Sequence, residues 1–151
     1  MNTAIKVAGG DDIDLQLLYF TSTSLSADGK GLAAIGEVGG NPNLYRVDLA
    51  TGAYTRLTNN EEGVLRSYVY FDGTPYRGFG KASISFDAKR RVLYCLQGRE
   101  LRVVDFDGEE RRLAVLPDDQ VTAFTHVSAD GKLICIPTTD EAAFTEDEAW
   151  N

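Results

Sequence analysis

The sequence predicts an all-β protein, and three observations carry that prediction. Apolar and polar residues alternate over short runs, turn-forming residues separate these runs, and no helix of useful length is visible. The clearest turn is Ser26 to Lys30, where Asp and Gly tolerate the required backbone angles. Similar turns return in SISFDAKRRVLYCL (83–96) and HVSADGKLICIP (126–137). Such repetition of short strands is typical of the blades of a β-propeller.

The spacing of the repeats sets the size of each blade. Aligning the serine before each turn makes Ser26, Ser85 and Ser128 equivalent. The second interval is close to the ~40–45 residues of a four-stranded blade, whereas the first is longer and contains an insertion. A chain of 151 residues is too short for the roughly 4–8 blades of a closed ring. We therefore expect an incomplete β-propeller of about two to three four-stranded antiparallel blades.

The first blade is expected at residues 20–58, after a leader at residues 1–19. Turn residues at 41–43 and 50–52 divide this blade into four strands. The strands are expected near 20–26, 31–37, 43–49 and 53–58.

An inserted rim loop or hairpin at 59–80 connects the first blade to the second, which covers 81–116. The second blade has the cleanest strand pattern in the chain, with strands expected near 81–86, 91–97, 100–106 and 110–116. Residues 117–151 then supply a partial third blade, with strands at 121–128 and 132–137, and an acidic tail. This ending predicts either a piece of a longer protein or an open array whose edges a partner or a homo-oligomer covers.

Composition narrows the partners and the location. The net charge of −8 argues against nucleic acid, because phosphate binding needs clustered Lys and Arg. The sequence shows no signal peptide and no run approaching ~20 apolar residues, so we expect a cytoplasmic protein without a membrane partner. Cys95 and Cys135 lie in apolar strand runs and are expected to be buried, reduced thiols.

Cationic residues gather in the middle of the chain, where they form either a band for an anionic ligand or solvated strand faces. The band comprises Arg66, Arg77, Lys81, Lys89, Arg90, Arg91, Arg99, Arg102, Arg111 and Arg112. Within it, Arg77 and Lys81 are candidates for carboxylate recognition, since Arg offers a bidentate fork and Lys a point charge. The alternative is ordinary loop charge at the rim.

His126 is the third candidate for substrate binding, and it is the one histidine of the chain. The alignment places it in register with Ser24 and Ser83 on inner strands near the central channel. It either hydrogen-bonds a neighbouring blade or contacts substrate. Asp28, Asp87 and Asp130 recur at the turns, and turn chemistry accounts for them better than acid catalysis does.

Residues 18–140 resemble the N-terminal part of the oligogalacturonate lyases, a seven-bladed propeller family that degrades pectin fragments. The stretches that carry this resemblance are LSADGKGLAAIGEVGGNPNLYRVDLATGAYTRLT, YVYFDGTPYRGFGKAS, LQGRELRVVDFDGE and DDQVTAFTHVSADGKLICIPTTD. The first is shared with TolB-like propellers, and the last is more specific to the lyases. The resemblance implies a cytoplasmic lyase that cleaves short oligogalacturonates by β-elimination with the help of manganese.

The chain departs from that family in one respect that bears on activity. A histidine-type metal site needs several converging ligands, and one histidine cannot supply them. We therefore assign no catalytic residue, metal ligand or cofactor to this chain, and expect manganese only in a full-length family member. Two functions remain: part of a lyase acting on an acidic oligosaccharide, or a TolB-like segment that binds protein or carbohydrate without catalysis.

Overall fold

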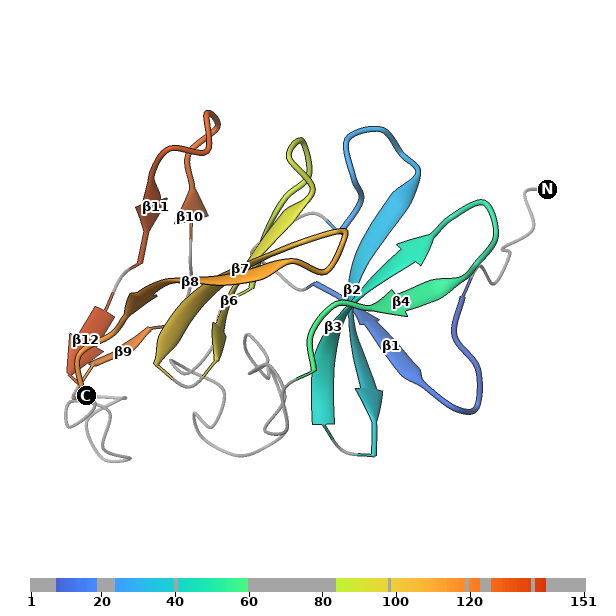
Figure 1. The fold of residues 1–151 in the computed structure, drawn as a ribbon, viewed down its shortest axis with the longest axis horizontal. Helices are drawn as coiled ribbons and strands as arrows, with labels where there is room; N and C mark the ends of the chain where they lie inside the picture. The colour runs from blue at the N-terminus through green and yellow to red at the C-terminus, as the bar shows by residue number, and fades with distance from the viewer. Residues whose placement is uncertain are drawn as a thin grey trace, which may run out of the picture.

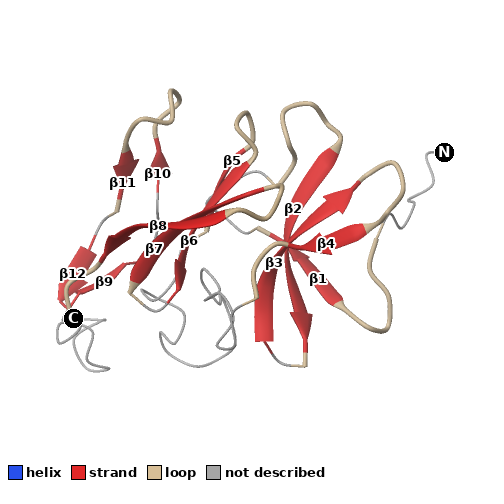
Figure 2. Cartoon of the chain, in the orientation of Figure 1, coloured by secondary structure: helices blue, strands red, loops and turns tan. Residues whose placement is uncertain are grey.

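The computed structural model describes residues 8–18, 24–39, 41–59, 84–97, 99–118, 120–122, 126–136 and 138–140. Regular structure in these ranges consists of β-strands, which the ribbon shows as sheets standing side by side (Figures 1 and 2). The same ranges contain no helix that is long and apolar enough to cross a membrane. The expected all-β class is thus confirmed.

Sheet 1 consists of four antiparallel strands in chain order, β1 to β4. The long central strands β2 and β3 pair along their whole length, from Gly31 opposite Asp48 to Val38 opposite Asn41. Gly36 fits this pairing because the ring of Tyr45 lies where its side chain would be, 2.5 Å from an added Cβ. The bounds are Asp14–Leu17 for β1, Gly31–Val38 for β2, Asn41–Asp48 for β3 and Tyr54–Arg56 for β4.

Sheet 2 repeats this order with β5 to β8. A register shift between Leu101 and Arg102 interrupts the pairing of β7 with β8. The bounds are Ser85–Asp87 for β5, Val92–Gln97 for β6, Glu100–Asp105 for β7 and Glu110–Val115 for β8. The last three strands agree with the sequence prediction to within one residue.

The third unit consists of two short antiparallel pairs, β9 with β12 and β10 with β11. Thr122 lies opposite Thr138 in the first pair, and His126 lies opposite Cys135 in the second. The bounds are Gln120–Thr122 for β9, His126–Val127 for β10, Ile134–Cys135 for β11 and Thr138–Asp140 for β12.

The hydrophobic core lies between sheets 1 and 2, because alternation along each strand gives each sheet one apolar face toward the other. Sheet 1 contributes Ala33, Ile35 and Leu44, and sheet 2 contributes Leu93 and Val104 across from them. All five are at most 6% exposed. A smaller cluster joins sheet 2 to the third unit, formed by Leu101 and Leu116 with Leu113, Ile134 and Ile136.

The structure corrects the expected start of the first blade. β1 falls within the stretch predicted to be a leader, and it pairs with the far half of β2, Leu17 lying opposite Ala34. The start of β2 instead pairs with a later segment, through an isolated bridge between Leu25 and Leu32. Two separate segments therefore share the partner strand that the sequence assigned to one strand at 20–26.

The alignment of the turns also needs correction. Ser26 and Ser128 each close a turn on the residue five positions later, Gly31 and Leu133. In sheet 2 the equivalent pair is Asp87 with Val92, so Asp87 rather than Ser85 corresponds to the two serines. The error is two residues, which leaves the alternation of faces unchanged.

Candidate functional site

Of the three residues predicted to bind substrate, the structure describes His126. Arg77 and Lys81 lie outside the described residues. His126 is exposed on β10, directly across from Cys135 on β11. Cys135 is an exposed free thiol and Cys95 a buried one, so the predicted burial of Cys135 is wrong. Burial raises the pKa of the Cys95 thiol to about 12.

The corrected register gives His126 different equivalents from those expected. One cross-strand pair occupies the same place in each of the three units: Leu25 with Leu32, Phe86 with Leu93, and Val127 with Ile134. His126 precedes its pair by one position, as Ser24 and Ser85 precede theirs. Ser24 is 9% exposed and Ser85 5%, whereas His126 is exposed. Packing between sheets therefore buries the position of His126 in sheets 1 and 2, but not in the third unit.

The repeated aspartates serve the turns, as the sequence indicates. Asp28 accepts hydrogen bonds from the hydroxyl of Ser26 at 2.6 Å and the amide of Lys30 at 3.0 Å. Asp130 does the same with Ser128 at 2.6 Å and Lys132 at 3.1 Å. These donors, the hydroxyl first, hold the pKa of each carboxyl below its ordinary value. A carboxyl held ionised in this way is a poor general acid.

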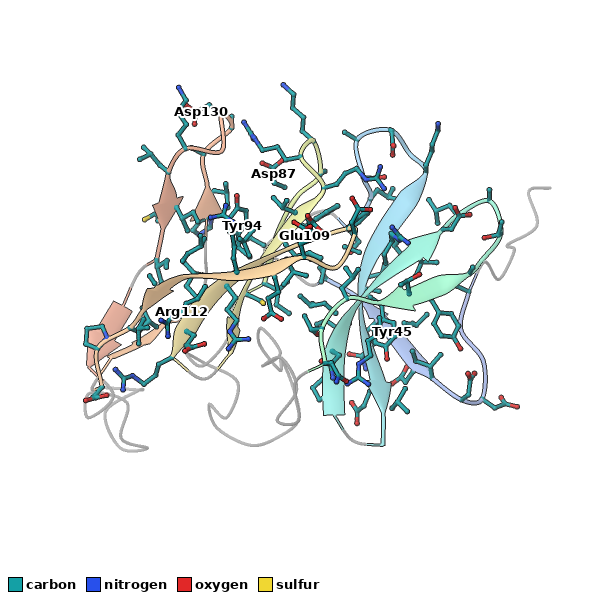
Figure 3. All side chains as sticks on the ribbon, in the orientation of Figure 1. Tyr45, Asp87, Tyr94, Glu109, Arg112 and Asp130 are labelled. Carbon is teal, nitrogen blue, oxygen red and sulfur yellow. The ribbon has the colours of Figure 1, made fainter. Side chains whose placement is uncertain are left out.

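The turns of neighbouring units touch one another at one end of the molecule, where Figure 3 labels Asp87 and Asp130. The amide of Ala27 donates to the carbonyl of Ala88 at 3.0 Å. The guanidinium of Arg90 pairs with Asp87 at 2.6 Å and also donates to the carbonyl of Asp130. These contacts join each turn to the next, while the repeated Ser and Asp side chains bond within their own turns.

We expect the turn carboxylates to contribute stability that acid removes. A carboxyl whose pKa is lowered by folding stabilises the folded state when the pH is above its unfolded pKa, ~3.9 for Asp. This stabilisation is lost as the pH falls through the folded pKa. Asp28→Asn should therefore be less stable than wild type at pH 7, with the difference shrinking from about pH 5 downward. Urea unfolding at a series of pH values measures it, with the exposed Asp11→Asn as control. A difference that stays constant with pH would contradict the expectation.

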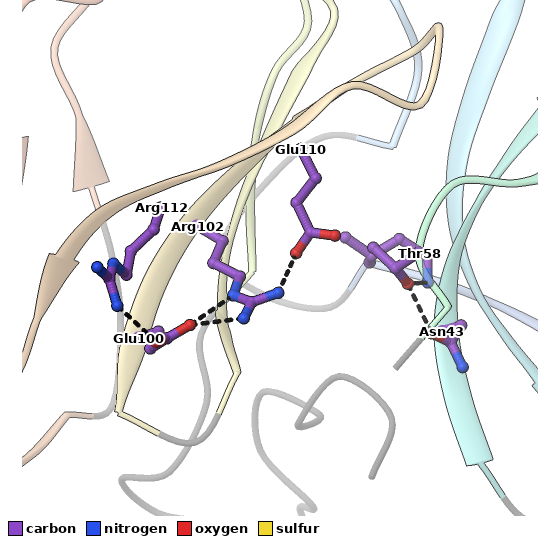
Figure 4. Close-up of polar contacts among 7 residues, drawn as sticks. Asn43, Thr58, Glu100, Arg102, Glu110 and Arg112 are labelled. Atoms are coloured by element: carbon purple, nitrogen blue, oxygen red, sulfur yellow. Dashed lines mark hydrogen bonds and ion pairs between the residues drawn. The ribbon is translucent and has the colours of Figure 1, made fainter. Parts of the chain in front are cut away.

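Part of the cationic band is already neutralised by carboxylates. Arg102 lies between Glu100, at 2.5 Å, and Glu110, at 2.7 Å, while Arg112 reaches Glu100 at 3.0 Å (Figure 4). The hydrogen bonds of Arg102 and then Arg112 lower the pKa of Glu100. Ion pairs with carboxylates also occupy Arg90, Arg91 and Arg99. These arginines are engaged within the protein, so they do not form a ready site for an anion.

A buried polar pair ends sheet 1 beside this network (Figure 4). The hydroxyl of Thr58 donates a hydrogen bond to Asn43 Oδ1 at 2.7 Å and accepts one from the backbone amide of Leu44 at 3.0 Å. Thr58 is 2% exposed and Asn43 is fully buried. The side chain thus replaces a backbone partner at the point where the chain leaves β4. Sequence reasoning missed this pair, because nothing local distinguishes Thr58 from other strand threonines.

A metal site is not visible in the part of the chain that the structure describes. No group of three or more His, Cys, Asp and Glu side chains there could hold an ion.

Comparison with known proteins gives matches among solved structures. No protein-family model and no curated protein sequence matches the chain. An oligogalacturonate lyase from Vibrio parahaemolyticus superposes with a TM-score of 0.68 and 18% identity, over 91% of this chain and 33% of that one. An oligogalacturonate lyase in complex with manganese superposes with a TM-score of 0.58 and 24% identity, over 80% of this chain and 28% of that one. The chain therefore spans about a third of the length of the structures that it matches.

At these identities the similarity establishes the fold. The predicted all-β, incomplete propeller is confirmed: four-stranded antiparallel sheets stand side by side without closing, and they match part of a lyase of this kind. The fold that the sequence resemblance implies is thus the fold that the matched structures share.

Proposed function

We propose that the chain forms the first blades of an oligogalacturonate lyase-like propeller and helps to bind short acidic oligosaccharides. The observation that carries this proposal is the pair of lyase structures that match 91% and 80% of the chain. The stretches of residues 18–140 that resemble the same family support the proposal from the side of the sequence.

The chemistry of the reaction sets the part that this chain could play. β-Elimination removes the proton next to a carboxylate, so the growing negative charge must be neutralised and the acid groups must be held in place. We assign carboxylate binding to Arg77 and Lys81. Arg offers a bidentate fork for a carboxylate and Lys a point charge, and both residues lie in the stretch YVYFDGTPYRGFGKAS that resembles the family. His126 is better explained by its buried equivalents Ser24 and Ser85, as a residue of a sheet contact.

Manganese enters this proposal through the family resemblance and through the second matched structure. The residues that the structure describes do not fit the ion, because they bring no three ligands together. We assign no catalytic step to the described residues, and we propose that the remaining blades of a lyase-like protein supply the metal and the base.

The second function that the sequence leaves open is a propeller segment that binds carbohydrate or protein without catalysis. An activity assay with manganese and digalacturonate distinguishes the two functions. The lyase proposal expects unsaturated uronate when the chain is supplied with the remaining blades of a lyase, whereas a non-catalytic module yields none from a reassembled, folded propeller.

Binding to digalacturonate should depend on its carboxylates. We expect calorimetric titration to detect digalacturonate and to find its methyl diester bound at least about tenfold more weakly, since a charged hydrogen bond contributes about 1.5–3 kcal/mol. Arg77→Ala and Lys81→Ala should each weaken binding of the acid by a similar factor. Arg111→Ala, on the exposed strand β8, is the matched control. Equal binding of acid and ester, or no effect of either variant, would overturn the proposed role of the two residues.

A further inference from the structure

The turn of sheet 2 differs in sequence from the turns on either side of it. The turns at 26–30 and 128–132 both read Ser-Ala-Asp-Gly-Lys, whereas the aligned residues 87–91, the basic turn, read Asp-Ala-Lys-Arg-Arg. Arg90 and Arg91 therefore take the places of a glycine and a lysine. Since a hairpin closes at the same place in all three units, the hairpin itself does not require the two arginines.

Arg91 fastens the basic turn to sheet 1. Its φ is 60°, a left-handed conformation that strains arginine but not glycine. Its guanidinium lies 5.1 Å from the ring centroid of Phe106, a core residue between the two sheets, and 3.9 Å from the carboxylate of Asp28 in the turn of sheet 1. In the same two turns, the amide of Ala27 donates a hydrogen bond to the carbonyl of Ala88 at 3.0 Å. These side-chain contacts account for an arginine where the backbone favours glycine.

Arg90 fastens the basic turn to the third unit. Its guanidinium pairs with Asp87 at 2.6 Å, which orients the side chain, and it also donates a hydrogen bond to the carbonyl of Asp130. The guanidinium packs against the backbone of Gly131, where an added Cβ would overlap it. At the equivalent Gly29 of sheet 1, an added Cβ would meet nothing within 4 Å. Gly131 thus serves the contact between units as well as its own turn, whereas Gly29 serves its own turn.

We propose that the basic turn is a clamp that sets how the three units sit on one another, with Arg91 holding the turn of sheet 1 and Arg90 the turn of the third unit. The two arms use different chemistry. The Arg91 arm places a cation over an aromatic ring and beside a carboxylate. The Arg90 arm makes a charged hydrogen bond to a backbone carbonyl next to a glycine, and a turn with a side chain at the position of Gly131 does not fit it. The clamp needs no ligand, so the inference does not rest on the proposed function.

A matched pair of glycines tests the Arg90 arm. Gly29 and Gly131 share a φ of 68°, so alanine strains both backbones alike. In urea unfolding of the full chain, we expect Gly131→Ala to lower the folding equilibrium constant at least about twofold more than Gly29→Ala does. In an Arg90→Ala background this excess should vanish, because the added Cβ overlaps the guanidinium. Equal costs at the two glycines, or an excess that survives Arg90→Ala, would overturn the Arg90 arm.

Hydrogen exchange under native conditions separates the two arms. The amide of Ser128 is bonded across the turn of the third unit, and the amide of Ala27 is bonded from sheet 1 to the basic turn. We expect Arg90→Ala to speed exchange at Ser128, and Arg91→Gly to speed exchange at Ala27. Each change should be at least about twofold and should leave the other amide unaffected. Faster exchange at both amides in both variants would show general destabilisation in place of a clamp.

The Arg91 arm also predicts the sign of a stability change. Glycine relieves the left-handed backbone, so Arg91→Gly would stabilise the protein if the side chain made no useful contact. We expect no gain in the urea midpoint, because the contacts with sheet 1 are lost. Lys89→Ala removes an exposed cation from the same turn and is the control, which should change neither the midpoint nor the two amides. A more stable Arg91→Gly would overturn the Arg91 arm.

Discussion

Replacing Phe106 by alanine is expected to lower the free energy of unfolding by about 3–5 kcal/mol, the usual cost of removing a buried aromatic side chain. Phe106 follows β7, is 3% exposed, and belongs to the core between sheets 1 and 2. Its ring stacks on Phe86 with centroids 5.1 Å apart, and the guanidinium of Arg91 lies 5.1 Å from the ring centroid. Alanine would leave a cavity at the junction of the two sheets. Urea unfolding followed by circular dichroism measures the loss.

The same position tests whether the two sheets fold as one unit. The ring fills the space beside Gly31, where an added Cβ would lie 3.0 Å from it. The backbone carbonyl of Phe106 accepts the guanidinium of Arg46 from sheet 1 at 2.6 Å, a contact that alanine retains. Val115→Ala, at a 51% exposed site, is the control and should cost less than about 1 kcal/mol. A similarly small cost for Phe106→Ala would show that the packing between the sheets adds little stability.

Thr58→Val should destabilise the protein by about 1–3 kcal/mol although it preserves the size of the side chain. Valine cannot accept the hydrogen bond from the buried amide of Leu44, and a buried donor left without its acceptor costs this much; valine also cannot donate a hydrogen bond to Asn43. Urea unfolding again measures the loss.

Thr58→Ser separates the hydroxyl from the methyl group. Serine retains both hydrogen bonds and removes one methyl group, which is worth roughly 0.8 kcal/mol. We therefore expect the serine variant to be more stable than the valine variant. If the valine variant proved as stable as the serine variant, the hydroxyl of residue 58 would not be what joins the segment after β4 to β3.

Local chemistry explains which features could be predicted from the sequence. The turns at Asp28 and Asp130 were predictable because their hydrogen bonds join residues two positions apart. Strands β6 to β8 were predictable because apolar and polar residues alternate along them between clear turns. β1 was missed because Asp14 and Gln16 give it the composition of a leader, and its pairing with β2 makes it a strand.

Of the candidate site, sequence reasoning identified residue types but not their surroundings. Arg102 was expected either to bind an anionic ligand or to lie on a solvated strand face, whereas Glu100 on β7 and Glu110 on β8 pair with it. His126 was expected beside the inner-strand serines Ser24 and Ser83. The structure replaces the second of these with Ser85, because a shift of two residues keeps the same face and leaves no trace in the alternation.

The sequence by itself determined the all-β class, the four-strand repeat and the chemistry of the turns, since these depend on residues close together in the chain. Only the tertiary structure decided the register and which faces are covered. Cys95 and Cys135 illustrate the difference: both lie in apolar strands, yet one is buried and the other is exposed. Alternation assigns a side chain to a face of its sheet, and burial depends on whether another sheet packs there.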